Sequence, residues 1–264
     1  MIGKILALPN DDTRKILSVA FILCLVCSLV VSTAAVYLRP LQQANKALDR
    51  KKQILDVAGL LTPGVDIDQR FAERIESRIV ELDSGEFTFD LVAEDYDQRA
   101  AARTPELSDP IPAVDDFAGI GRRARYAPVY LVRENGDLAQ LILPMHGYGL
   151  WSTMYGFLAL ESDLQTVAGI KFFDHAETPG LGGEIDNPAW QSRWVGKQIY
   201  EQPGIPRLRV IKGRVNTAAI EAQYQVDGIS GATLTANGVT NMLAYWLGGN
   251  GFGEFLIKLR ETGV

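Results

Sequence analysis

Three hydroxyl side chains, Ser230, Thr233 and Thr235, lie in the stretch Asp-Gly-Ile-Ser-Gly-Ala-Thr-Leu-Thr, just before a helical pattern. From residue 234 to residue 247 apolar side chains recur mostly at spacings of three and four, and Gly248 follows as a stop signal. The first N–H groups of a helix lack intrahelical partners and lie at the positive end of the helix dipole, so they attract anions. A phosphate ester on Thr233 or Thr235 would suit this position. The same spacing also fits a plain helix cap, because Ser and Thr are common N-caps.

This stretch resembles the signal that bacterial flavin transferases read when they attach FMN to a threonine through a phosphoester. The residues that carry the resemblance are Asp227, Ser230, Gly231, Ala232 and Thr233. It implies that Thr233 carries a covalent FMN, with Thr235 as the alternative if the register is read two residues further on. It also implies a flavin transferase as the partner that matures the protein.

A second glycine-rich loop, Glu-Thr-Pro-Gly-Leu-Gly, covers residues 177–182. Its Pro-Gly pair suits the central positions of a type II turn, and a plain turn is the simplest interpretation. The loop is also similar to one in the FMN-binding domain family, which implies that Thr178 and Leu181 contact the flavin. Weaker candidates for the opposite wall of the site are Gly149, Leu150 and Trp151.

Longer matches extend the resemblance to the C subunits of the sodium-translocating NADH:quinone reductases. They are the ten residues from Ser230 to Val239, Leu23–Ser28, Leu38–Pro40 and the tail Gly251–Leu256. The resemblance implies an electron-carrier subunit that relays electrons through its covalent FMN from NADH toward ubiquinone, coupled to sodium export. The implied partners are five other subunits, among them the B subunit with a second covalent FMN and membrane iron–sulfur subunits. The alternatives are the homologous flavin subunit of the ferredoxin-linked ion pump, a membrane-tethered FMN-binding sensor or adaptor, and a flavin-free adhesion or scaffold domain.

Residues 16–38 contain no charged side chain. As a helix they would be roughly 35 Å long, which exceeds the ~30 Å hydrocarbon core of a membrane. This length favours a transmembrane helix over the alternative, a cleavable signal peptide. Basic residues are more numerous after the segment, which by charge alone would keep the C-terminal part in the cytoplasm. The family resemblance implies the reverse, and we expect a single-pass protein of the bacterial inner membrane, with residues 1–15 cytoplasmic and the flavin domain periplasmic.

Composition excludes several other classes. The net charge of −6 argues against nucleic acid as a partner. Cys24 and Cys27 both lie in the apolar segment, where burial as small hydrophobes is favoured over a redox pair. With only His146 and His175 elsewhere, no metal site is expected. The chain also lacks a Rossmann glycine fingerprint and a Walker A lysine.

Residues 39–120 are predicted to form a helical stalk and an acidic arm. The stalk continues from the membrane to Gly59, and a second helix is predicted from the cap Asp66 through Leu82 to Gly85. Residues 53–120 hold 16 acidic side chains, five arginines and no lysine, a net charge of −11. A solvated surface is the favoured interpretation. A docking face, or a field that gathers cations, is the alternative.

Residues 121–264 are predicted to form the FMN-binding domain. Asn135-Gly136 between apolar alternations predicts a β-hairpin. Strands are predicted over Val129–Val132, Leu138–Leu143, Tyr155–Leu160, Val167–Phe173 and Arg207–Ile211. Because hairpins outnumber helical crossovers, the predicted class is α+β, in which a single transmembrane helix and the helical, acidic arm precede an antiparallel-sheet domain.

Overall fold

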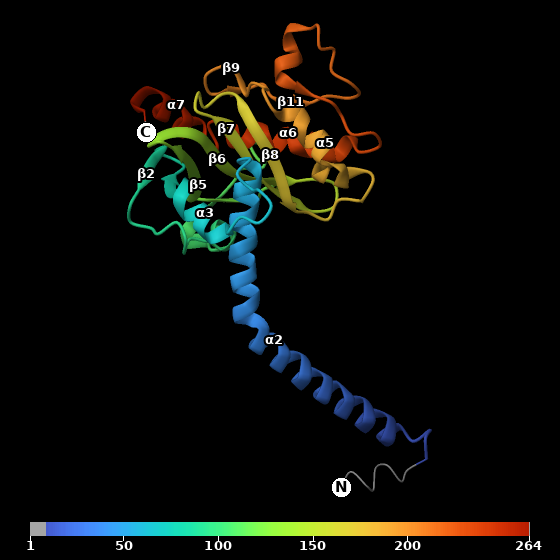
Figure 1. Ribbon diagram of the computed structural model, residues 1–264. Coiled ribbons are helices and arrows are strands. Elements are labelled where there is room, and N and C mark those ends of the chain that lie inside the picture. Colours follow the sequence, from blue (N-terminus) through green and yellow to red (C-terminus); the bar gives the residue numbers. More distant parts are fainter. Residues whose placement is uncertain (1–8, 264) are drawn as a thin grey trace. The chain divides into compact units, whose positions relative to one another are not determined.

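A computed structural model describes residues 9–263 of the 264-residue chain. The chain divides into a unit that ends at Arg50 and a compact unit that begins at Lys51. Each unit is described by itself (Figure 1). The first eight residues of the expected cytoplasmic tail lie outside the described residues.

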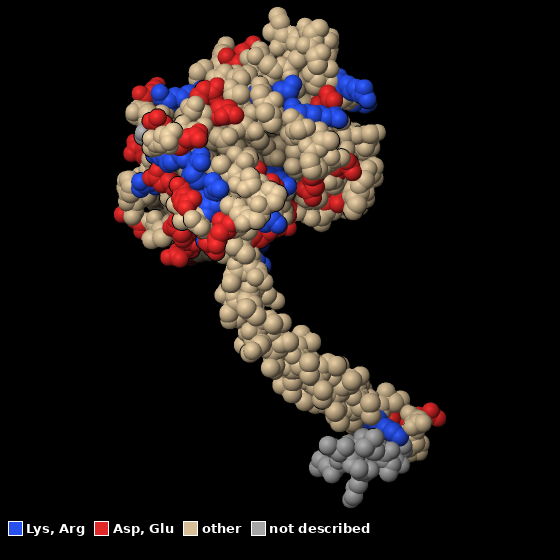
Figure 2. Space-filling model, in the orientation of Figure 1, with Lys and Arg blue, Asp and Glu red and all other residues tan. Residues whose placement is uncertain are grey.

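Helix α2, Thr13–Val57, makes up most of the first unit, and its residues 51–57 belong to the compact unit. The helix includes the expected span 16–38. Within the described residues, α2 is the one helix long and apolar enough to cross a membrane, with a mean hydropathy of 2.7 over its most apolar window. The face of this helix that Figure 2 shows is uncharged between its two ends, and residues 16–38 contain no charged side chain. The helix ends where expected, since Gly59 adopts a φ of +69° and the Leu60 N–H donates to the Leu55 carbonyl at 2.8 Å.

The compact unit is built on a six-stranded sheet with the strand order β2-β1-β5-β6-β7-β8. All neighbouring strands pair antiparallel, as predicted. The strands are β1 (Ile75–Glu81), β2 (Glu86–Thr88), β5 (Tyr126–Glu134), β6 (Asp137–Tyr148), β7 (Thr153–Glu161) and β8 (Val167–Asp174). The predicted hairpin is confirmed, because Asn135 and Gly136 join β5 to β6 with φ values of 53° and 94°.

The helix predicted from Asp66 to Gly85 is wrong in its second half. Helix α3 covers only Ile67–Arg74, and Ile75 starts strand β1. The apolar spacing of four residues is compatible with a helix, but β1 pairs with β5 along its whole length and buries Ile79. Tertiary pairing of β-branched residues therefore overrides the helical pattern. As a result, the compact unit includes residues well before the domain boundary expected at residue 121.

Both faces of the sheet are covered (Figure 1). On one face, α6 (Thr233–Leu247) and α7 (Gly253–Thr262) contribute to a core that includes the fully buried Trp246 and Phe252. On the other face, the last turns of α2 and helix α3 pack Leu55 and Phe71 against the sheet. Burial of apolar surface on both faces holds the sheet between the helices and stabilises it.

The remaining elements are short. Between β2 and β5 lie α4 (Gln98–Arg103), η1 (Pro105–Leu107), β3 (Ser108–Pro110) and β4 (Arg122–Ala124). After β8 come η2 (Gly182–Asp186), α5 (Pro188–Gln191), η3 (Ser192–Trp194), β9 (Tyr200–Gln202), β10 (Ile205–Pro206), β11 (Arg209–Val210), η4 (Ile220–Tyr224) and β12 (Gln225–Val226). The strand predicted over Arg207–Ile211 is thus reduced to β11, which pairs in parallel with β12.

Many carboxylates of the acidic arm pair with cations from other parts of the compact unit. Arg133 binds Glu76 at 2.9 Å, and Lys258 binds Glu86 at 2.7 Å. Further pairs join Arg125 to Asp109 and Arg123 to Asp83. Figure 2 shows acidic and basic side chains interspersed on the visible face of the unit. This mixing favours the solvated-surface interpretation of the arm, because exposed ion pairs of this kind contribute little stability.

Candidate functional site

The predicted chemistry centres on the first turn of α6, where two threonines have opposite environments. Thr233 is the first helical residue, and its side chain is exposed. Thr235 is 0% exposed, and its hydroxyl donates to the Glu177 carboxylate at 2.5 Å. No side chain caps the helix at Ala232, so the N–H groups of the first turn are open to a ligand. Thr233 is therefore the threonine whose hydroxyl is accessible.

The turn before α6 is fixed by residues of the stretch 227–233, which resembles the flavin-transferase signal. Asp227 accepts a hydrogen bond from the Val215 N–H at 2.8 Å and forms an ion pair with Arg193 at 2.8 Å. Asp227 thus anchors the turn. Gly228 lies so close to the Ile211 carbonyl that a Cβ would collide with it. Gly231 adopts a φ of +73°, a left-handed conformation that glycine supplies without strain.

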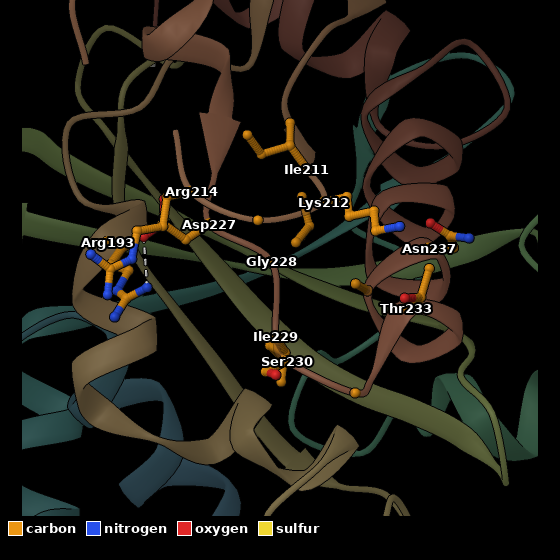
Figure 3. Close-up of a pocket in the computed structure, with 14 residues that line it drawn as sticks. Arg193, Ile211, Lys212, Arg214, Asp227, Gly228, Ile229, Ser230, Thr233 and Asn237 are labelled. Atoms are coloured by element: carbon orange, nitrogen blue, oxygen red, sulfur yellow. Dashed lines mark hydrogen bonds and ion pairs between the residues drawn. The ribbon is translucent and has the colours of Figure 1, made fainter. Parts of the chain in front are cut away.

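A cavity of about 510 Å³ opens beside this turn (Figure 3). Its lining includes Ser230, Thr233 and Asn237 on one side, and the cations Arg193, Lys212 and Arg214. Arg193 is paired with Asp227, whereas Lys212 and Arg214 make no ion pair or side-chain hydrogen bond with any residue that the structure describes. In Figure 3 the Lys212 side chain extends toward Asn237 and Thr233. This cavity combines open cations with an accessible hydroxyl, which suits a phosphate ester.

The second predicted loop lies against the first. The Leu181 N–H donates to the Thr178 carbonyl at 3.1 Å and Gly180 has a φ of +76°, which confirms the type II turn. Thr178 accepts a hydrogen bond from the Trp151 indole at 3.1 Å. Leu181 is 44% exposed, and a Cβ at Gly231 would lie 2.9 Å from its side chain. The loops at residues 149–152, 177–183 and 227–233 therefore meet at one place.

Glu177 joins these segments and was not predicted as a site residue. Only 5% of it is exposed, and its carboxylate accepts hydrogen bonds from the N–H groups of Leu150 at 2.9 Å and Trp151 at 3.0 Å, as well as from Thr235. Burial alone would raise the pKa of Glu177, but the hydrogen bonds from Thr235 and the backbone outweigh it and lower this pKa. The only signal in the sequence was an acidic residue at the start of a glycine-rich loop.

Because its pKa is lower in the folded chain, Glu177 should stabilise the fold above its ordinary pKa of 4.5 and lose that contribution as the pH falls through the folded value. We expect Glu177→Gln to lower the free energy of unfolding by about 1–3 kcal/mol at neutral pH. The difference from the wild type should shrink below pH 4.5. Thermal unfolding of both proteins between roughly pH 3 and pH 8 measures this difference, which should follow the linkage relation. If the difference in stability between the two proteins stayed constant across this pH range, ionisation of Glu177 would not contribute to the stability of the fold.

The two histidines have structural partners. His175 contacts Asp186 at 2.7 Å and accepts a hydrogen bond from the Glu177 N–H at 3.1 Å, so it orders the loop. His146 stacks on Tyr155, and burial lowers the pKa of its imidazole to about 4. Within residues 9–263, no group of His, Cys, Asp and Glu side chains could hold a metal ion.

Comparisons with known proteins agree with this geometry. The model of a family described as an FMN-binding domain matches residues 149–248, which span the three loops and α6. The chain is 50% identical to the C subunit of the Na(+)-translocating NADH-quinone reductase of Pseudomonas aeruginosa, over 96% of this chain and 98% of that protein. It is 46% identical to the corresponding C subunit of Vibrio vulnificus, over 97% of this chain and 98% of that protein.

Solved structures show the same architecture. The crystal structure of Shewanella oneidensis NqrC has a TM-score of 0.77 and 34% identity, and the match covers 83% of this chain and all of that chain. The crystal structure of the C subunit from Parabacteroides distasonis has a TM-score of 0.65 and 29% identity, with coverage of 83% and 96%. Near-complete alignment at this identity, an FMN-binding domain and a shared α+β fold lead to one conclusion. The chain belongs to the family of the C subunits of Na(+)-translocating NADH-quinone reductases.

Proposed function

We propose that this chain is an electron-carrier subunit that holds FMN covalently, through a phosphoester on the Thr233 hydroxyl. The observation that carries the proposal is the contrast within one helical turn. Thr233 is exposed at an uncapped helix N-terminus, whereas the Thr235 hydroxyl is buried and engaged by Glu177. Of the two candidate threonines, only Thr233 offers a hydroxyl to a modifying enzyme.

The residues around Thr233 fit a flavin phosphate. The free N–H groups of α6 and the open cation Lys212 suit the negative phosphodiester, and Ser230 and Asn237 add polar partners in the cavity. Thr178 and Leu181 present a hydroxyl and an exposed apolar surface next to the same turn, and we assign them to the flavin ring or its ribityl chain. Bound FMN would supply the redox chemistry that no side chain here provides. A covalent bond retains this cofactor at an open site.

The wider role follows from family membership. We propose that the subunit relays electrons between redox centres of neighbouring subunits, on the way from NADH to ubiquinone, and that this transfer drives sodium export. The partners in this proposal are five other subunits, including the B subunit with its own covalent FMN and the membrane iron–sulfur subunits, together with a flavin transferase. The chain is anchored in the membrane by α2. We propose the bacterial inner membrane, with the compact unit on the periplasmic side.

Lys212 provides a test of the phosphate contact. We expect Lys212→Gln to reduce the fraction of chains that acquire flavin by roughly several-fold under limiting transferase, because a charge-assisted contact to the phosphate is lost. Lys52→Gln is the matched control, since Lys52 is exposed and is absent from the lining of the cavity. The ratio of flavin to protein absorbance in the purified, denatured chain measures the fraction. If both variants lost the same fraction of flavin, or if neither lost any, Lys212 would be excluded as a phosphate contact.

Purification from membranes tests the function. The subunit should co-purify in a stable complex with five other subunits, and its own denatured gel band should fluoresce, because only a covalent flavin survives denaturation. A fluorescent subunit that purifies alone would support the alternative of a tethered FMN-binding sensor or adaptor. Co-purification with a complex that oxidises ferredoxin instead of NADH would support the ferredoxin-linked alternative. If the denatured band of the subunit showed no fluorescence, both the electron-carrier function and the alternative of a flavin-binding sensor would be excluded.

A further inference from the structure

The Glu177 carboxylate is a fixed negative charge without a cationic partner in the part of the chain that the structure describes. Its hydrogen-bond donors are all neutral, and they include the backbone N–H groups of Leu150 and Trp151 and the hydroxyl of Thr235. No lysine, arginine or histidine among the described residues forms an ion pair with it, although three cations line the cavity on the other side of the α6 turn. The charge is therefore held in place by dipoles and is not neutralised by a neighbouring ion.

Packing fixes the position of this carboxylate. A Cβ on Gly149 would come within 2.5 Å of one carboxylate oxygen, and a Cβ on Gly182 within 2.7 Å of the other. The two glycines thus allow the backbone of both loops to close around the side chain. Thr178 follows Glu177 directly, and Thr235 lies two residues after Thr233 in the same turn of α6. The charge is located between the two segments to which we assign the flavin.

We propose that Glu177 is a positioning residue that also lowers the reduction potential of the flavin carried by Thr233. This inference depends on the proposed function, since it requires a flavin on Thr233. The carboxylate joins the three loops of the site, and it opposes any increase of negative charge beside them. In a buried setting this opposition is stronger than in water, because the effective dielectric constant is lower.

The charge balance of reduction gives the direction of the effect. In a spectroelectrochemical titration the electrode supplies two electrons per flavin, and water supplies the protons that accompany them. When two protons are taken up, the flavin keeps its charge, and when only one is taken up, it gains one negative charge. A neighbouring carboxylate disfavours the second outcome, so removal of that carboxylate should move the potential in the positive direction.

Glu177→Gln separates charge from shape. The glutamine has the same size, and its carbonyl oxygen still accepts hydrogen bonds from the Leu150 and Trp151 N–H groups, while the charge is lost. Glu177→Asp makes the opposite change, because it keeps the charge but shortens the side chain. Glu184→Gln is the matched control for the first variant, because Glu184 lies in the same segment but its side chain bonds to the Asn187 side chain.

The experiment is a spectroelectrochemical titration of the full-length, flavinylated protein in detergent, with flavin content and thermal midpoint measured on each variant. We expect a positive shift in potential for Glu177→Gln. Glu177→Asp should keep a potential near that of the wild type despite a lower thermal midpoint, and Glu184→Gln should change neither quantity appreciably. This pattern would show that charge, and not loss of packing, sets the shift.

Other outcomes would overturn the inference. An unchanged or negative shift in Glu177→Gln, a shift of equal size in Glu184→Gln, or an equal shift in Glu177→Asp would each exclude a charge effect of Glu177. In all three cases a fluorescent wild-type band would leave the proposed function intact. A wild-type band without fluorescence would instead overturn the proposed function and this inference together.

Discussion

Thr233→Val is expected to abolish covalent flavin, so that the denatured subunit shows no fluorescence and its intact mass equals that of the unmodified chain. Valine has nearly the shape of threonine but has no hydroxyl that could form the phosphoester. Thr233 is exposed, so its replacement should leave the thermal midpoint of the flavin-free chain almost unchanged, with an effect of about 0.5 kcal/mol or less. The loss of flavin would then arise from the missing acceptor and not from unfolding.

Thr235→Val is the matched control, and it should show the reverse pattern. This variant should keep its flavin, because Thr233 is still present and exposed. It should nevertheless be less stable by about 1–2 kcal/mol, since the buried Thr235 hydroxyl no longer donates to Glu177. Flavin retained in Thr233→Val and lost in Thr235→Val would contradict the assignment and move the attachment site by two residues.

Much of the fold could be predicted because the signals were local. Asn135-Gly136 sets its own backbone conformation, so the hairpin between β5 and β6 follows from two residues. Gly59 ends α2 for the same reason, through its left-handed conformation. The helix that begins at Thr233 was equally visible, because its apolar side chains repeat at helical spacing over several turns.

The parts of the fold and of the candidate site that the sequence did not predict depend on contacts between distant segments. Ile75 and Ile79 fit a helical spacing, and only their pairing with β5, far along the chain, makes them a strand. Glu177 and Thr235 are 58 residues apart in the chain, so no spacing rule could reveal that the carboxylate engages the buried hydroxyl. Asp227 belongs to the stretch that resembles the flavin-transferase signal, but its anchoring role became clear only from its side-chain contacts with Arg193 and the Val215 N–H. Local patterns thus predicted where the candidate site lies, and a long-range hydrogen bond distinguishes the buried Thr235 from the exposed Thr233.

Gly228→Ala is expected to have the second largest effect, because this glycine lies where two segments of the site are in closest contact. The Gly228 N–H donates to the Gly213 carbonyl at 2.8 Å, and this bond extends the parallel pairing of β11 and β12 toward the turn before α6. An alanine Cβ would collide with the Ile211 carbonyl, a backbone atom that cannot rotate away as a side chain would. We expect a loss of about 1–3 kcal/mol in the free energy of unfolding, the range for overpacking.

The same change should also lower flavin incorporation strongly, because displacement of Gly228 moves Asp227 and the turn that presents Thr233. Gly249→Ala is the matched control, since nothing lies within 4 Å of its added Cβ and its φ is outside the left-handed region. Thermal unfolding and in-gel fluorescence of the two variants measure both effects. If Gly228→Ala matched Gly249→Ala in stability and flavin content, the turn would tolerate displacement. The contact between Gly228 and Ile211 would then not be what holds Thr233 in its accessible position.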